Sequence, residues 1–170
     1  MFRPTTTNLI VCVLSISLHS AACSDSEDAD ATPAEALVIN ELLASNRSGL
    51  LDEDGDPSDW VELANRGDDA VNLAGWYLTD DREVLDKWAL PDVDLAPGGY
   101  LVIFASGKDR RGASGSNLHT NFKLATEGEY LALTKRGEQL EVESEFSPGY
   151  GLQGEDISWG THVSPGYHYL

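Results

Sequence analysis

The sequence predicts an all-β domain, either a sandwich or a barrel. From Ala36 onward, short apolar runs recur about every 8 to 12 residues, and Gly, Pro, Asn or Asp closes each run. No segment carries the sustained hydrophobic period of an amphipathic helix. No repeat with a period of roughly 20 to 50 residues is present either, so a propeller or a solenoid is not expected.

The expected strands are short and separated by turn residues. They are Leu37–Leu43, Trp60–Ala64, Val71–Leu73, Trp76–Leu78, Lys87–Leu90, Tyr100–Ala105, Leu118–Phe122, Tyr130–Thr134 and Leu140–Phe146. One segment, Gly107–Asn117, is rich in Gly, Ser and charge, and we expect it to be a loop. Its three cations, Lys108, Arg110 and Arg111, form either a partner contact or simply the mobile end of a hairpin.

The charge balance excludes one class of partner. The chain of 170 residues contains 29 Asp and Glu against 11 Lys and Arg, a formal net charge of -18. Such a charge repels phosphate backbones and anionic lipid surfaces. Nucleic acid is therefore not an expected partner, and the length fits one globular domain with short appendages.

The N-terminus has the pattern of an export signal. Arg3 precedes an apolar run, Leu9–Leu18, which is too short to span a bilayer as a helix but suits the core of a signal peptide. The following Ser20-Ala21-Ala22-Cys23 resembles the lipobox of bacterial lipoproteins, although Ser20 stands where Leu is usual. We therefore predict lipidation of Cys23 and anchoring to a bacterial membrane, with plain secretion after cleavage behind Ala22 as the alternative.

Composition divides the chain into three parts. Residues 1–22 are the predicted signal peptide, residues 23–36 form an acidic tether without large apolar side chains, and residues 37–170 form the β-sandwich domain. The only cysteines are Cys12 and Cys23, and the first leaves with the signal. No disulfide is therefore expected within the exported chain.

An acidic loop that leads into a strand is the sharpest local feature. Between Asp52 and Asp59 the chain carries five carboxylates and no basic residue. Asp52, Asp54, Asp56 and Asp59 are the candidate metal ligands, because calcium binds clustered oxygen atoms and Gly55 lets the backbone turn. Calcium is the one cofactor that the sequence suggests.

The EF-hand pattern does not fit this loop. Counted from Asp52, the sixth position is Pro57 where Gly is required, and the twelfth is Leu63 where a bidentate Glu is required. The alternative is a solvated surface turn in which Asp side chains bond to the local backbone.

No catalytic signature is visible. The Gly-x-Ser-x-Gly elbow is missing, and His119, His162 and His168 lack a metal-binding spacing. Glu41 and Glu62 lie on expected strands, where they either form a glycosidase-like pair or, by alternation, both face water. We predict no enzyme. A cryptic hydrolase would need His119 or His162 to meet a carboxylate and a hydroxyl in a concave pocket.

Tryptophans are the remaining candidate for a binding surface. Trp60, Trp76, Trp88 and Trp159 either form a platform for sugars or peptides or fill the core. Because they lie within apolar alternation, we expect core positions.

Several short motifs, taken in order, resemble the lamin tail domain family. They are Gly75-Trp76-Tyr77-Leu78, Trp88-Ala89-Leu90-Pro91, Leu95–Ile103 and Gly128–Leu133, with Asp59–Leu63 and His119–Phe122 as in the secreted bacterial branch. The resemblance covers about Leu37 to Gly160. It implies an immunoglobulin-like β-sandwich and a non-catalytic module that binds partners, with the tryptophans largely in the core.

The resemblance and the export signal together give a functional expectation. We expect a non-catalytic binding or structural module outside the cytoplasm, lipid-anchored at the bacterial cell surface, whose partner is an extracellular protein or polymer. The alternatives are a calcium-stabilised adhesion module and an accessory domain of a secreted hydrolase. Bacterial members usually continue past Ser158–Gly160 into a longer ending, so Ser164–Leu170 is either a shortened closing strand or the end of a fragment.

Overall fold

A computed structural model describes residues 36–112 and 117–160, and in these ranges every regular element is a strand. The strands are β1 (Leu37–Leu43), β2 (Trp60–Asn65), β3 (Val71–Asn72), β4 (Trp76–Thr79), β5 (Trp88–Ala89), β6 (Asp94–Leu95), β7 (Tyr100–Phe104), β8 (Arg110–Arg111), β9 (Leu118–His119), β10 (Leu131–Arg136), β11 (Leu140–Phe146) and β12 (Trp159–Gly160). The all-β prediction is confirmed.

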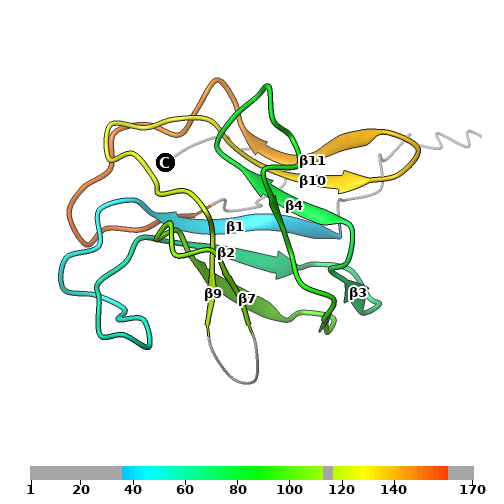
Figure 1. Ribbon diagram of the computed structural model, residues 1–170, viewed down its shortest axis with the longest axis horizontal. Coiled ribbons are helices and arrows are strands. Elements are labelled where there is room, and N and C mark those ends of the chain that lie inside the picture. Colours follow the sequence, from blue (N-terminus) through cyan, green and yellow to red (C-terminus); the bar gives the residue numbers. More distant parts are fainter. Residues whose placement is uncertain (1–35, 113–116, 161–170) are drawn as a thin grey trace, which may run out of the picture. The chain divides into compact units, whose positions relative to one another are not determined.

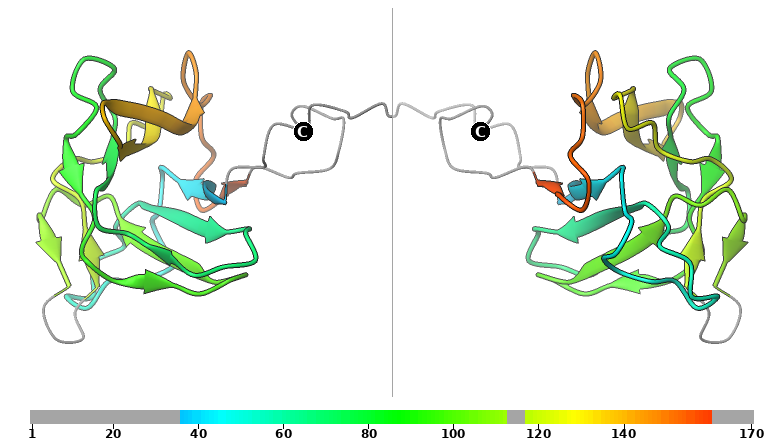
Figure 2. Two further views of the ribbon diagram at one scale, coloured as in Figure 1. Left: turned by 90° about the vertical axis from the view of Figure 1, so that its right-hand side faces the viewer. Right: turned by 90° about the vertical axis from the view of Figure 1, so that its left-hand side faces the viewer.

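The strands form two main sheets that face each other (Figure 1). One sheet has the order β12-β1-β2-β7-β9-β8 and the other the order β11-β10-β4-β5, while β3 and β6 form a separate pair. Pairing is antiparallel except between β7 and β9, which run parallel. Seen from the side, the sheets are two layers, as in an immunoglobulin-like sandwich (Figure 2).

The core lies between the two sheets. Val61 of β2 pairs with Ile103 of β7 in one sheet, and Leu78 of β4 pairs with Leu133 of β10 in the other. All four side chains are fully buried, as is Trp88, which pairs with Leu78. Burying apolar area of this kind is the main stabilising contribution in a domain without disulfides.

Three of the six two-residue strands were not predicted from the sequence. β6, β8 and β12 have two residues each, and such strands are defined by their partners and not by their own pattern. β8 lies inside the segment Gly107–Asn117, so the expectation of a loop throughout that segment is wrong. The expected strands Lys87–Leu90 and Leu118–Phe122 are reduced to β5 and β9.

The tryptophans divide into two pairs. Trp76 and Trp88 are buried, which confirms their core assignment. Trp60 and Trp159 are half-buried, and Trp159 stacks on Phe146 with ring centroids 5.8 Å apart. The last two tryptophans therefore lie at the margin of the core.

Several predictions fall on residues outside the described ranges. They concern the signal peptide, the tether, Cys23, His162, His168 and the ending Ser164–Leu170. Within the described ranges, no helix has the length and hydrophobicity of a membrane span.

Candidate functional site

Asp52 organises the acidic loop from its centre. Its Oδ1 accepts hydrogen bonds from the backbone N–H groups of Asp54 and Asp56, both at 3.0 Å. Its Oδ2 accepts a bond from the hydroxyl of Ser58 at 2.9 Å. Gly55 has a φ of 81°, a conformation that favours glycine. The loop is thus a folded turn built around one buried carboxylate.

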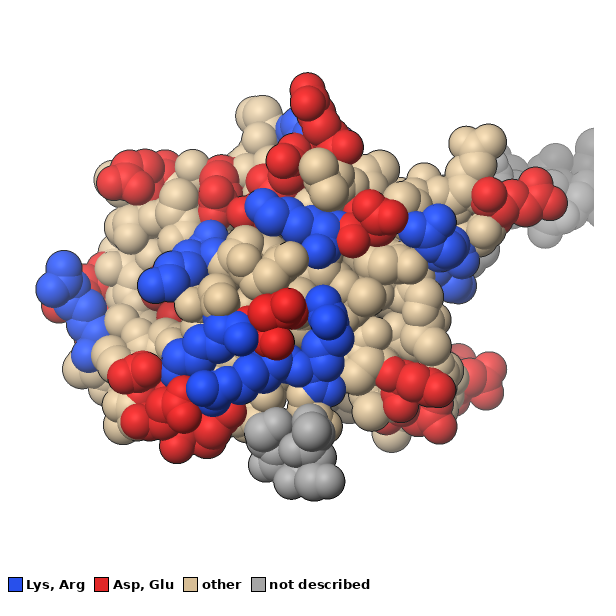
Figure 3. Space-filling model, viewed as in Figure 1, with Lys and Arg blue, Asp and Glu red and all other residues tan. Residues whose placement is uncertain are grey.

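A lysine from the segment that follows β7 neutralises this turn. The Lys108 Nζ donates to Asp52 Oδ2 at 2.6 Å, to Asp54 Oδ2 at 2.7 Å and to Asp56 Oδ2 at 2.9 Å. Figure 3 shows cationic side chains lying directly against a group of acidic ones in this region. The ammonium occupies the place at which a metal ion would meet the same three carboxylates.

An arginine adds a second link. Arg110 Nη1, on β8, lies 2.8 Å from Glu53 Oε1 and 2.8 Å from Asp54 Oδ2. Two cations of the segment that precedes β9 therefore hold four carboxylates of the acidic loop. An ion-pair network of this kind fixes two loops that are far apart in the sequence.

The network shifts the protonation of its members. Burial alone would raise the pKa of Asp52, but the hydrogen bonds from Lys108, from the backbone and from Ser58 hold it well below its usual range. The pKa of Lys108 is well above its usual range, because its bonds to Asp52, Asp54 and Asp56 outweigh its own burial. These groups are therefore charged at neutral pH.

Glu53 is linked to a buried histidine. Its Oε2 lies 2.9 Å from Nε2 of His119, whose Nδ1 lies 2.8 Å from Oγ of Ser106. The His119 bond, with those from the Glu53 backbone and Arg110, lowers the pKa of Glu53 to about 2 against the opposing effect of burial. His119 is fully buried and stacks on Phe104, with the ring centroids 5.3 Å apart.

Asp59 lies apart from the other predicted metal ligands. Its Oδ1 accepts the backbone N–H of Asn46 at 2.9 Å, and burial raises its pKa. The carboxylates that approach one another closely enough to share an ion are those of Asp52, Asp54 and Asp56. The structure thus brings together three of the four residues singled out in the sequence.

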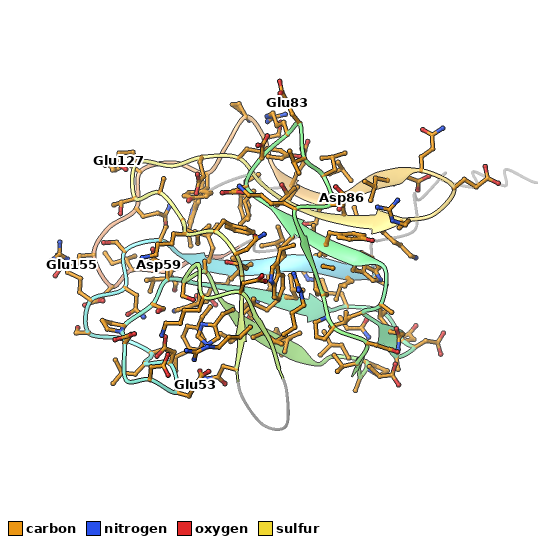
Figure 4. The ribbon with its side chains drawn as sticks, viewed as in Figure 1. Glu53, Asp59, Glu83, Asp86, Glu127 and Glu155 are labelled. Atoms are coloured by element: carbon orange, nitrogen blue, oxygen red, sulfur yellow. The ribbon has the colours of Figure 1, made fainter. Side chains whose placement is uncertain are left out.

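A polar hollow of about 370 Å³ lies between the acidic loop and the end of β7. Its lining is Asn46, Asp56, Pro57, Ser58, Asp59, Ala105, Ser106, Lys108 and Lys123. Figure 4 shows Glu53, Asp59 and Glu155 toward the same end of the domain. We call the hollow, the acidic loop and the two adjoining segments, residues 45–51 and 151–158, the loop end.

The other predicted carboxylate pair lies elsewhere. Glu41 and Glu62 are direct partners across β1 and β2, and both are half-exposed. Asn40 Nδ2 donates to Glu62 Oε1 at 2.7 Å. Neither glutamate lines the hollow, and both are partly open to water as alternation suggested.

Sequence reasoning did not find Ser106, nor the contacts of Lys108 and Arg110 with the acidic loop. The available signal was electrostatic: in a chain this acidic, the densest group of cations is the natural partner of the densest group of carboxylates. Lys108 and Asp52 are 56 residues apart, and only the pairing of β2 with β7 brings them together.

Comparison with known proteins identifies the family. No curated protein matches the chain. The model of the Lamin Tail Domain matches residues 30–147, well over half of the chain. That family is structural and non-catalytic, and its fold is the immunoglobulin-like sandwich described above. The chain belongs to the lamin tail domain family.

Proposed function

We propose that this domain is a binding and structural module that works outside the cytoplasm, turns over no substrate and is held at the bacterial cell surface by a lipid on Cys23. Its family membership supports a non-catalytic role. The apolar run Leu9–Leu18 followed by Ser20-Ala21-Ala22-Cys23 supports export and anchoring. The partner is an extracellular protein, which binds at the loop end.

Exposed apolar side chains at the loop end are the observation that carries this proposal. Leu50 and Leu51 are 49% and 54% exposed, and Leu152 and Ile157 are 77% and 65% exposed. Large apolar side chains exposed on two linked loops favour a contact with a protein over a contact with a polar polymer. These four are half of the large apolar side chains exposed in the described part of the chain.

The two loops that carry these side chains are joined by one aspartate. Asp156 Oδ1 accepts the backbone N–H groups of Arg47 at 2.7 Å and Ser48 at 3.0 Å. Its Oδ2 accepts the Ser48 hydroxyl, and the Asp156 N–H donates to Ser45 at 2.9 Å. The hydrogen bonds from Ser48 and Arg47 lower the pKa of Asp156 to about 2, so it is charged under all ordinary conditions.

Hydrogen bonds also connect this surface to the acidic loop. Asn46 Nδ2 donates to Leu50 O at 2.7 Å and to Ser58 O at 2.8 Å, which ties the apolar segment to the acidic loop. Loops that are already fixed lose less conformational entropy on binding. The carboxylates of the acidic loop thus act in the scaffold, and the apolar side chains act in the contact.

A paired set of surface variants tests the partner surface. Leu152→Asp with Ile157→Asp places charge at the loop end, and Val93→Asp with Tyr100→Asp places it elsewhere on exposed apolar positions. A photo-crosslinker at Ser48 of the cell-surface protein should capture one defined extracellular protein. We expect the first pair to abolish this capture and the second to leave it intact. Equal capture by both pairs would contradict the proposal.

The anchor is tested separately. The wild-type chain should partition into detergent and incorporate labelled fatty acid when it is expressed in a bacterial host, and Cys23→Ser should do neither. Identical partitioning of the two chains would exclude the anchor and would leave plain secretion.

A calcium-stabilised adhesion module is the second candidate. It is favoured by the close approach of Asp52, Asp54 and Asp56, whose ligand oxygens lie within 4.8 Å of one another. Calcium would have to displace the Lys108 ammonium from this position. A rise in the midpoint of thermal unfolding at millimolar calcium would support this candidate, and an unchanged midpoint would remove it.

A further inference from the structure

A hydroxyl, an imidazole and a carboxylate form one hydrogen-bonded chain beside the hollow. Ser106 follows β7, His119 ends β9 and Glu53 belongs to the acidic loop. The distances are 2.8 Å from Ser106 Oγ to His119 Nδ1 and 2.9 Å from His119 Nε2 to Glu53 Oε2. A nucleophile, a base and a group that orients the base are the parts of an activated serine, whatever their order in the sequence.

The hydrogen-bond network assigns the proton positions. Glu53 is a carboxylate held by Arg110, so it accepts a hydrogen bond and His119 Nε2 carries the proton. In the neutral imidazole, Nδ1 then has a free lone pair, which accepts the Ser106 hydroxyl. The Lys108 backbone N–H donates to Ser106 Oγ at 3.2 Å and leaves the hydroxyl proton directed at the imidazole.

Packing holds the base in this orientation. The His119 side chain is fully buried and its ring stacks on Phe104. Either imidazole nitrogen can act as a base, and the bond made by the other nitrogen decides which one does. The ring therefore presents Nδ1 to Ser106.

The serine borders a space that a small molecule can enter. Ser106 lines the hollow of about 370 Å³, which is at the lower end of the usual volume of ligand pockets. Lys123 lines the same hollow and is exposed, so it offers positive charge for an oxygen that becomes negative during attack.

We propose that Ser106 is an activated nucleophile that accepts an acyl group from a small activated ester. The Ser106 Oγ forms a bond to the acyl carbon while the bond from that carbon to the ester oxygen breaks. The hydroxyl proton moves to His119 Nδ1 and then to the departing alcohol, so that no further reactant is needed. This reactivity goes beyond the binding role and does not depend on the partner or on the anchor.

The test is acetylation of the purified chain by p-nitrophenyl acetate. Release of p-nitrophenol gives the rate, and peptide mass spectrometry gives the acetylated residue. We expect acetyl at Ser106 and none at Ser147, an exposed serine in the same molecule that serves as the internal control. Ser106→Ala should lose the fast reaction, and Glu53→Gln should slow it by at least about 100-fold.

A second measurement needs no variant that could fail to fold. In the wild-type chain, Ser106 should be acetylated faster than the exposed Ser147, because only Ser106 is hydrogen-bonded to an imidazole in the described residues. Acetylation of Ser106 no faster than that of Ser147 would overturn the inference. One acetyl group per chain supports it. Continuous Ser106-dependent release also supports it, while contradicting the non-catalytic part of the proposed function.

Discussion

The acidic loop and the strand β11 are both rich in carboxylates, but the carboxylates are ion-paired in the loop and exposed on β11. In the acidic loop the carboxylates of Asp52, Glu53, Asp54 and Asp56 are held by Lys108 and Arg110 at 2.6–2.9 Å. On β11, Glu141 and Glu145 are exposed, and within the described residues neither forms an ion pair. One acidic region is part of the scaffold, whereas on β11 Glu141 faces water and the exposed Glu145 contacts only the Tyr130 hydroxyl.

The difference shows that burial, more than charge density, decides what a carboxylate does. Asp52 is buried, so its charge has to be compensated inside the protein. Glu141 is solvated by water, and its field is screened by salt. β11 is an edge strand of its sheet in the described residues, and like charge along an edge opposes pairing with a second copy.

Removing the buried carboxylate charge should have the largest effect on stability. Asp52→Asn leaves Lys108 with weaker partners and takes one acceptor from the turn. We expect the free energy of unfolding to fall by about 3 kcal/mol, because an ion partly shielded from water loses its counter-charge. Urea unfolding measures it. A loss below about 0.5 kcal/mol would contradict this prediction, because it is the value expected for a solvated surface carboxylate.

Replacing Lys108 should have the second-largest effect on stability, and it tests whether the three carboxylates need a cation between them. Lys108→Gln removes the ammonium from three carboxylates, and we expect a loss of about 2 kcal/mol in stability. Calcium should then raise the midpoint of unfolding of Lys108→Gln more than that of wild type, because the variant has no competing ammonium. Equal responses to calcium would show that the ammonium does not occupy a cation position.

Acid should destabilise the wild type more than Lys108→Gln. The folded-state pKa values of Asp52, Glu53 and Asp54 are lowered, so their contribution is present above about pH 4.5 and is lost as pH falls toward 2 and below. Without Lys108, the pKa values of Asp52 and Asp54 return toward their usual range and the decline becomes shallower. Urea unfolding from pH 6 to pH 2 compares the slopes, and identical slopes would contradict this account.

The smallest effect is expected on β11. Glu141→Gln with Glu145→Gln should change the free energy of unfolding by less than about 0.5 kcal/mol at neutral pH, because both side chains are exposed. A larger loss would mean that the charges of Glu141 and Glu145 also stabilise the folded domain.

The local hydrophobic pattern was enough to predict the β-sandwich, but it was not enough to predict the candidate site. Strands such as β1 and β11 have the bounds that their own alternation and flanking turns predict. The tryptophans at the core, Trp76 and Trp88, also follow from their apolar neighbours. The two-residue strands β6, β8 and β12 were missed because a partner strand, not local pattern, defines them.

The acidic loop was found in the sequence, but what compensates it was not. Water and calcium were the alternatives, and the contacts instead come from Lys108 and Arg110. The chain of Ser106, His119 and Glu53 was missed for the same reason, since its members lie on three segments brought together by the sheet. Contacts between distant segments depend on strand order, which the pattern of one sequence does not determine.

A double-mutant cycle of Asp52→Asn and Lys108→Gln tests the central claim, that the acidic loop is stabilised by the lysine of the neighbouring segment. The free energies of unfolding of the wild type, the two single variants and the double variant give the coupling between the two residues. Their atoms are 2.6 Å apart and Asp52 is buried, so we predict a coupling of at least about 1.5 kcal/mol at neutral pH. Additive effects, with a coupling below about 0.3 kcal/mol, would contradict the claim.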